Sequence, residues 1–178
     1  MRLEPLEPRH EDALWEVAQD ERAWRWMRAR SGASREAFGE WFRSMEPPTL
    51  GFATIVDGRA GGHSSYLNVR KDDRVLEIGN TWLTPELWGT GANTETKLLL
   101  MQHAFEDEGY LRVEFKTDAR NERSRAALAA LPAEFEGVFR KHMLVRGGER
   151  RDSAWYAVID DDWPAVKVNL LRRLSRGG

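Results

Sequence analysis

The spacing of apolar positions changes along the chain, and each change predicts a different element of secondary structure. Near the N-terminus, Arg2 to Leu6 alternates as a short strand does, and its prolines fit an edge strand. Apolar residues at helical spacing follow, and Pro47-Pro48 ends this helical region. Three helices are expected there, from Pro8 onward, over Glu21–Arg30, and over Arg35–Met45 with Ser34 as its cap.

The rest of the chain alternates strands with three further helices. The strand patterns cover Leu50–Val56, Ala60–Val69, Val75–Leu83, Leu111–Thr117, Phe135–Val145 and Arg151–Asp160. Asp57-Gly58 and Gly147-Gly148 predict turns, and Gly61-Gly62 indicates a bulge. The helix patterns cover Thr94–Glu108, Asn121–Leu131 and Trp163–Leu174. This order predicts one mixed α/β domain over residues 1–178, with a parallel strand–helix–strand unit at its centre.

The loop Trp88-Gly89-Thr90-Gly91-Ala92-Asn93 joins a predicted strand to the longest predicted helix. The free backbone N–H groups of a first helical turn and the positive end of the helix dipole attract anions. Two glycines allow a ligand to approach the backbone closely. In a parallel unit such a loop lies at the carboxyl end of its strand, where ligands bind. We therefore expect an anion, such as a phosphate group, to bind here.

Composition narrows the classes of function. The 178 residues carry a net charge of −2, which provides no basic field for nucleic acid. The absence of cysteine excludes a thiolate metal site and a thiol nucleophile, and no two histidines have metal-ligand spacing, so no metal is expected. No apolar run has the length of a membrane span or the form of a signal peptide, so we expect a soluble cytoplasmic protein.

Several stretches together resemble the GCN5-related N-acetyltransferase (GNAT) superfamily, and within it the ribosomal-protein N-terminal acetyltransferase-like group. They are Gly79-Asn80-Thr81-Trp82-Leu83, WGTGANTE from Trp88, VEFKTDARNERS from Val113, EGVFRKHM from Glu136 and RDSAWYAV from Arg151. They stand in the expected order between Gly79 and Val158, and the combination is specific. The resemblance implies a twisted mixed sheet whose fourth and fifth strands, here Val75–Leu83 and Leu111–Thr117, splay apart to admit acetyl-coenzyme A (acetyl-CoA).

The resemblance also assigns residues to this cofactor. Backbone groups near Trp82 and Leu83 would pair with the pantetheine arm, and Asn121 would hydrogen-bond to the same arm. The loop would hold the pyrophosphate through Trp88, Gly89, Thr90, Gly91, Ala92, Asn93 and Thr94. Relatives usually have Gln or Arg where Trp88 stands, and Gly or Ala where Asn93 stands. Because an indole offers no charge to a phosphate, binding is expected to depend on backbone amides.

Acetyl transfer to an amine needs a proton acceptor and a group that stabilises the leaving thiolate. The resemblance places Ser124 near the sulfur, because Leu128 stands where many relatives have a tyrosine acid. The alternative is that Asn121 only caps a helix and that Ser124 is solvated. Glu77 is the candidate base, directly or through water, and the alternative is a structural ion pair with an arginine across the sheet.

The acceptor is expected to be a primary amine, at a protein N-terminus or in a small molecule, and the protein to be a monomer or a homodimer. Trp24 and His63 are candidate acceptor contacts. Core packing for Trp24 and a structural hydrogen bond for His63 are the alternatives. A non-catalytic sensor or scaffold that binds acyl-CoA is the other interpretation of the whole chain. A nucleotide hydrolase is a weaker one, since the loop lacks the motif G-x-x-x-x-G-K-S/T.

Overall fold

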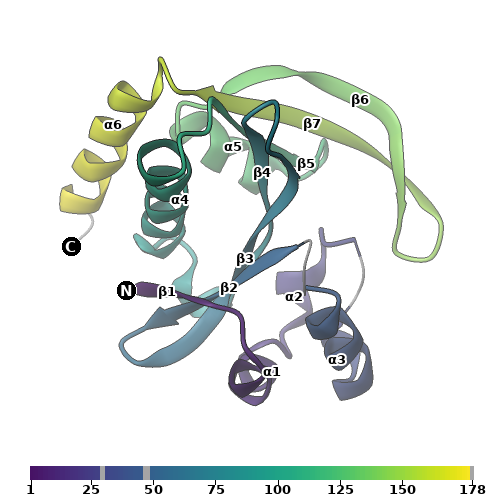
Figure 1. Ribbon diagram of the computed structural model, residues 1–178. Helices are drawn as coiled ribbons and strands as arrows, with labels where there is room; N and C mark the ends of the chain where they lie inside the picture. The colour runs from purple at the N-terminus through teal and green to yellow at the C-terminus, as the bar shows by residue number, and fades with distance from the viewer. Residues whose placement is uncertain (29–30, 46–48, 177–178) are drawn as a thin grey trace.

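The computed structural model describes residues 1–28, 31–45 and 49–176, and it consists of one twisted sheet with helices on both faces (Figure 1). The predicted helix end at Arg30 and the Pro47-Pro48 stop lie outside the described residues. Elsewhere the order of strands and helices is the predicted one. The mixed α/β fold is therefore confirmed.

The sheet has seven strands in the order β1-β2-β3-β4-β5-β7-β6. Their bounds are Arg2–Pro5 (β1), Leu50–Val56 (β2), Arg59–Arg70 (β3), Val75–Leu83 (β4), Arg112–Asp118 (β5), Glu134–Val145 (β6) and Glu149–Ile159 (β7). β1 lies at one edge, as its prolines predict, and the long β6–β7 hairpin arches outward at the other end (Figure 1). β4 and β5 run parallel, as the strand–helix–strand pattern predicts, and the other neighbouring strands of the described sheet are antiparallel.

β4 and β5 stay paired over only three positions, from Val75 opposite Arg112 to Glu77 opposite Glu114. Beyond Glu77 the two strands part, and β4 continues to Leu83 with no strand on this side. Backbone N–H and C=O groups in such a stretch need another partner. The predicted splay is thus confirmed, and it leaves β4 able to pair with an extended ligand.

A bulge at Asn80 changes which face each β4 side chain occupies. Asn80 has a φ of 47°, and the pairing of β4 with β3 shifts register here. Leu76 and Ile78 pack in one core cluster, whereas Trp82 packs in a second cluster with the N-terminal helices. Without an inserted residue these even-numbered positions would share one face. His63 holds the bulge, because its Nδ1 lies 3.0 Å from the carbonyl oxygen of Asn80.

Helices cover the sheet in two groups. α4 (Ala92–Gln102), α5 (Glu122–Ala130) and α6 (Trp163–Arg176) pack in the cluster that holds β4, β5 and β7. α1 (Glu11–Val17), α2 (Glu21–Trp24) and α3 (Arg35–Arg43) pack in the second cluster, with residues of β2 and the end of β4. Ser34 caps α3 as predicted, because its Oγ accepts a hydrogen bond from the N–H of Ala37 at 3.1 Å.

α2 is shorter than predicted, since it ends at Trp24 and does not continue toward Arg30. Trp24 and Trp26 are two positions apart, so one helix cannot turn both toward the same neighbour. Trp24 is buried, and its Nε1 donates to the carbonyl oxygen of Ala18 at 2.6 Å. Trp26 instead lies beside the guanidinium of Arg146 near the β6–β7 turn. The two indoles therefore contact different parts of the fold.

Other local predictions agree more closely. The pairing of β2 with β3 shifts between Thr54 and Ile55, which confirms the bulge predicted at the glycine pair. The long helix begins at Ala92 and ends in a π-helical turn, His103–Asp107, followed by Gly109 with a φ of 68°. No helix of the described residues is long and apolar enough to cross a bilayer.

Candidate active site

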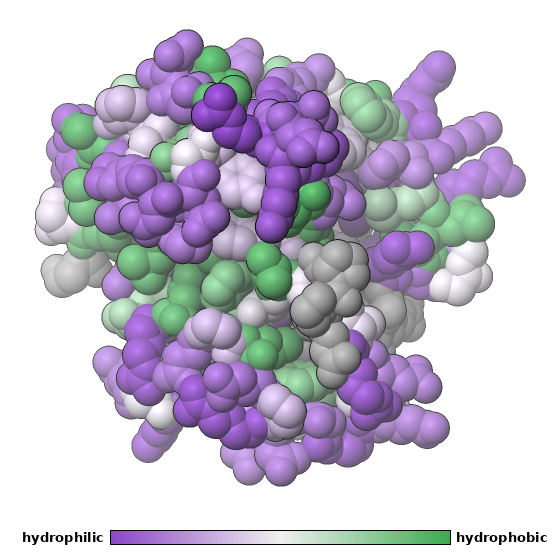
Figure 2. Space-filling view, viewed as in Figure 1, coloured by the Kyte–Doolittle hydropathy of each residue, from purple (hydrophilic) through white to green (hydrophobic). Residues whose placement is uncertain are grey.

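A cleft of about 1210 Å³ opens where β4 and β5 part. Its walls come from α2, α3, β3 to β5, the loop after β4, the starts of α4 and α5, and the β6–β7 hairpin. A single drug-sized ligand occupies a pocket of about 300–1,000 Å³, so the cleft has room for a long cosubstrate and a second molecule. Apolar side chains gather across the middle of the face shown in Figure 2, between two polar regions.

The residues singled out from the sequence divide into two groups. Those that line the cleft are Glu77, Trp82, Leu83, Trp88, Gly89, Asn93, Thr94, Asn121 and Ser124. Thr90, Gly91, Ala92, Trp24 and His63 lie outside its walls. The structure therefore brings together the carboxyl end of β4, part of the loop after it and the start of α5.

The loop after β4 presents backbone amides to the cleft. Gly91 occupies the N-cap position of α4. The N–H groups of Asn93 and Thr94 lie in the first turn, where a helix has no acceptors for them. The N–H of Ala92 already donates to Thr90 Oγ1 at 3.2 Å. The amides of Asn93 and Thr94 are therefore the N–H groups of this turn that remain available to an anion.

Trp88 is held in place by the strand that precedes it. Its indole Nε1 donates to the carbonyl oxygen of Leu83 at 2.9 Å. This carbonyl is one of the groups expected to pair with a pantetheine arm, and the N–H of Thr84 is also engaged, by the carbonyl oxygen of Gly61 at 2.9 Å. Strand-like pairing with a ligand must therefore depend on β4 backbone groups before Leu83.

Arg123 of α5 reaches across the cleft to Trp88. Its Cζ lies 3.6 Å from the centre of the indole ring, which is a close cation–π contact. Among the described residues, no carboxylate forms an ion pair with Arg123. Sequence reasoning missed this residue, although it directly precedes Ser124 on a helix expected to face the ligand. Arg123 brings to the cleft the positive charge that an indole cannot supply.

Asn121 and Ser124 stand together at the start of α5. Asn121 caps the helix, because its Oδ1 accepts a hydrogen bond from the N–H of Ser124 at 3.2 Å. The capping alternative is thus observed, but it engages only the oxygen, and the Nδ2 group can still donate to a ligand. Ser124 is half-buried, and its hydroxyl makes no hydrogen bond to the described residues. Both side chains can therefore serve a ligand in the cleft.

Glu77 is almost completely buried, with 1% of its surface exposed. Its Oε2 accepts hydrogen bonds from Lys116 Nζ at 2.6 Å and from Asn68 Nδ2 at 2.8 Å. An ion pair across the sheet therefore exists, with a lysine of β5 in place of the expected arginine. Oε1 has no hydrogen-bond partner among the described residues, and Gly79 leaves room for it, because a Cβ there would lie only 2.9 Å away.

Lys97 of α4 is a second cleft residue that sequence reasoning missed. It is 7% exposed, and its Nζ donates to Thr81 Oγ1 at 2.8 Å, which lies 2.7 Å from Ser64 Oγ. Burial lowers the pKa of Lys97 to about 7, although the carboxylate of Glu77 opposes the shift. The available signal was its spacing from Thr94, since residues three apart share a helix face.

A comparison with models of protein families shows the family to which the chain belongs. Residues 1–133, about three-quarters of the chain, match the family model described as the acetyltransferase (GNAT) domain. The chain belongs to the GNAT acetyltransferase family. Membership indicates an acyltransferase, and GNAT acetyltransferases as a family act on an amine acceptor. Residues after the matched span form β6, β7 and α6 of the same sheet and helix layer.

Solved structures support this membership. A protein of T. thermophilus assigned as an acetyltransferase is 38% identical, with a TM-score of 0.90 over 97% of this chain and 93% of that chain. A GCN5-related N-acetyltransferase from Brucella melitensis is 33% identical, with a TM-score of 0.91 over 99% of this chain and 86% of that one. A search among curated proteins gave no match.

A more distant structure bears on the expected subgroup. Mycobacterium smegmatis RimJ, solved in complex with CoA-disulfide, is 21% identical, with a TM-score of 0.80 over 96% of this chain and 88% of that one. At that identity the likeness shows the fold alone. It does not assign this acetyltransferase to the RimJ group.

In this GNAT acetyltransferase the two candidate acceptor contacts lie behind the cleft wall. Trp24 is 2% exposed and packs against Trp41 and Trp82, which themselves line the cleft. His63 is completely buried, and its ring packs edge-on against Trp41 at 4.9 Å. Burial lowers the pKa of His63 to about 4, so it is neutral at pH 7. The described residues contain no cluster of three or more histidine, aspartate or glutamate side chains that could hold a metal ion.

Lys97→Met should stabilise this acetyltransferase at neutral pH, and the gain should shrink as the pH rises. The pKa of Lys97 is about 7 in the fold, against 10.5 without burial, so the unfolded chain binds more protons between these values. Wild-type stability therefore rises across this window, by at most about 1.4 kcal/mol per pH unit, and the variant lacks that rise. Urea unfolding at several pH values, with the exposed Lys71→Met as control, measures the difference. The same pH dependence in the wild type and Lys97→Met would show that Lys97 stays charged when buried.

Proposed function

We propose that this protein is an acetyl-CoA-dependent N-acetyltransferase, which transfers the acetyl group from the thioester to a primary amine by direct attack. The observation that supports the proposal is that one cleft holds both a candidate anion site and two oxygen atoms suited to proton transfer, Ser124 Oγ and Glu77 Oε1, which have no hydrogen-bond partner among the described residues. The anion site consists of the amides of Asn93 and Thr94 with Arg123, and the proton-transfer groups are Ser124 and Glu77. The whole span 1–178 would act as one domain, because its last strands complete the sheet.

Cofactor binding would use both walls of the cleft. The loop amides and Arg123 would hold the pyrophosphate, because backbone N–H groups at a helix start and a guanidinium both favour phosphate oxygens. The unpaired edge of β4 up to Trp82 and the Nδ2 group of Asn121 would hold the pantetheine arm. RimJ of M. smegmatis, which shares the fold, was solved with a CoA derivative, and this supports the choice of cofactor.

The transfer would proceed without an acyl-enzyme. The amine nitrogen attacks the thioester carbon, the carbon–sulfur bond breaks, and the thiolate leaves. Glu77 would take the proton from the attacking nitrogen through its free Oε1, directly or through a water molecule. Ser124 would donate a hydrogen bond from its hydroxyl group to the thiolate as it leaves, and the thiolate would then take a proton from solvent. The acceptor would be a small amine or a protein N-terminus, as in the RimJ-like group that the sequence resembles.

Arg123→Gln should weaken the binding of CoA without affecting pantetheine, which has no phosphate. Loss of a partly exposed charge-assisted contact should raise the Kd for CoA by about 3- to 10-fold at low salt. Isothermal titration with both ligands measures the difference, and the exposed Arg172→Gln on α6 is the matched control. Equal losses for CoA and pantetheine would show that Arg123 acts through the shape of the cleft instead of through phosphate charge.

Ser124→Ala should lower kcat by about 10- to 100-fold while the Kd for CoA changes less than about twofold. The reason is that the serine hydroxyl is required only when the thiolate leaves. Release of free thiol from acetyl-CoA, followed over a panel of amines, measures kcat, and it also tests the proposed reaction itself. Ser44→Ala is a suitable control, because Ser44 lines the cleft but its hydroxyl donates to the carbonyl oxygen of Trp41 at 2.6 Å. Tight CoA binding by the wild type without thiol release for any amine would contradict the catalytic proposal and favour a sensor.

Glu77→Gln should remove the acidic limb of the pH–rate profile and lower kcat by about 100-fold or more. Glutamine keeps an oxygen for Lys116 and Asn68 but cannot take up a proton. Glu114→Gln provides the control, because Glu114 lies opposite Glu77 on β5, is 8% exposed, and is ion-paired with Arg112. An unchanged acidic limb in Glu77→Gln, at full activity, would exclude Glu77 as the base.

A further inference from the structure

Arg151 of β7 carries a largely buried guanidinium that has no partner among the described residues. The residue is 7% exposed, and it lines the cleft beside Met143, which is its neighbour on β6. Its Nε has no hydrogen-bond partner among the described residues, and none of its nitrogens forms an ion pair with them. Burial lowers the pKa of Arg151, although the carboxylates of Asp118 and Glu77 oppose the shift. The guanidinium therefore has donors on the cleft wall that no described residue uses.

The carboxylates near Arg151 are already engaged by other cations. Asp118 accepts from Arg120 at 2.8 Å and from Arg146 at 3.2 Å. Glu149 is ion-paired with the same two arginines, at 2.6 and 3.0 Å. Glu77 holds Lys116 at 2.6 Å. These groups neutralise one another, and no carboxylate of the described residues is left to form an ion pair with Arg151.

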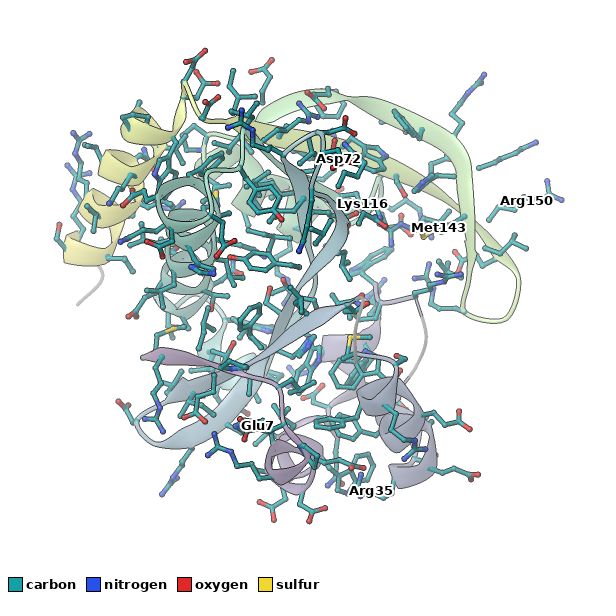
Figure 3. All side chains as sticks on the ribbon, in the orientation of Figure 1. Glu7, Arg35, Asp72, Lys116, Met143 and Arg150 are labelled. Carbon is teal, nitrogen blue, oxygen red and sulfur yellow. The ribbon has the colours of Figure 1, made fainter. Side chains whose placement is uncertain are left out.

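Arg151 also shares a sheet face with the groups placed at the reacting end of the cleft. Side chains of β7 alternate between faces, so Arg151 and Trp155 point to the same side. Trp155 lies directly opposite Lys116 of β5, and Lys116 is bonded to Glu77. In Figure 3, Lys116 and Met143 lie on the inner side of the curved sheet, whereas Arg150 extends away from the hairpin into solvent. Arg151 therefore lies on the same face of the sheet as Glu77, beside the place where β4 and β5 separate.

A buried charge without an ion-pair partner lowers the stability of a fold. A protein that keeps such a charge is therefore expected to use it to bind another molecule. We propose that Arg151 binds a carboxylate on the acceptor, so that the acceptor is a small amine that also carries a carboxylate group. This inference rests on the acetyl transfer proposed above. A planar guanidinium donates two parallel hydrogen bonds to a carboxylate, a geometry that an ammonium group does not offer.

The charges of the cleft argue for the same class of acceptor. Among the described residues, the arginines and lysines that line it are Arg28, Lys97, Lys116, Arg123, Arg151 and Arg173, of which Lys97 has a pKa of only about 7, against two carboxylates, Glu40 and Glu77. Arg123 is assigned to the cofactor phosphates, and Glu77 neutralises Lys116. A polyamine would place further positive charge beside Arg151, where like charges repel. A carboxylate would instead neutralise it, and the attached amine would be held near Glu77.

The test compares amines that differ only in one group. β-Alanine and γ-aminobutyrate are assayed beside their carboxamides, with spermidine as a polycation, by thiol release from acetyl-CoA. The carboxylate members should be preferred by about 10- to 100-fold in kcat/KM, which is the range for one charge-assisted hydrogen-bonded pair. In Arg151→Gln this preference should fall to about one, through KM more than kcat, while the Kd for CoA stays unchanged. Arg150→Gln, the exposed neighbour on β7, should keep the preference.

Several results would overturn the inference: preference for the carboxamides or spermidine, a preference retained in Arg151→Gln, or a loss of CoA affinity in that variant. If no amine releases thiol although CoA binds, the proposed transfer fails, and calorimetry with the same amines in the presence of CoA then decides the inference separately. Binding of the carboxylate members to the wild type but not to Arg151→Gln would support it. Absence of any carboxylate binding to the wild type would overturn it.

Stability gives an independent readout. Arg151→Met should raise the thermal midpoint by about 2–8 °C, because it removes an uncompensated buried charge and keeps the length of the side chain. Arg150→Met should leave the midpoint within about 2 °C, since Arg150 is exposed. A lower midpoint for Arg151→Met would show that the guanidinium is already satisfied within the fold, and the acceptor role would be lost.

Discussion

The structure depends on a sheet that stops pairing in its middle. β4 and β5 are parallel neighbours only as far as Glu77 and Glu114, and the backbone beyond that point must find other partners. The bulge at Asn80 helps to keep the strands apart, since it bends β4 and turns Trp82 toward the N-terminal helices. His63 fixes the bulge from inside the protein. His63, a candidate acceptor contact, therefore lies behind the cleft wall. It holds β4, the strand that forms this wall.

The separation of β4 and β5 also explains why several charged side chains are buried. Side chains that a continuous sheet would cover with neighbours instead face a cleft, and the protein places Glu77, Lys97 and Arg151 there. Among the described residues, Glu77 alone of these three has an ion-pair partner, Lys116. Buried groups of this kind lower folding stability, and lowered pKa values such as those of Lys97 and Arg151 are typical of functional sites. The cost in stability and the chemistry of the site thus come from the same residues.

Sequence reasoning reached the parts of this fold that local rules determine. Strand alternation, the turn glycines, the Ser34 cap and the loop before α4 all follow from short-range spacing, and each is confirmed. The missed residues depend on contacts across the cleft. Arg123 meets Trp88, and Arg151 differs from Arg150 only in what the folded hairpin buries. A sequence pattern indicates the face on which a side chain lies, but not how deeply the folded protein buries that side chain. For this reason the sequence could not show that Trp24 lies behind the cleft wall.

The loop after β4 departs from the family pattern, and a residue on the opposite wall of the cleft compensates for the charge that the loop lacks. Trp88 replaces a residue that could contact phosphate, and its indole is fixed by the carbonyl oxygen of Leu83. The missing charge then comes from Arg123, which belongs to the helix after β5 and stacks on Trp88. In the proposed complex the amides on the β4 side and the guanidinium on the β5 side would bind the same phosphates. The cofactor would therefore join the two strands that the sheet leaves unpaired, and its affinity would depend on the width of the cleft as well as on the loop.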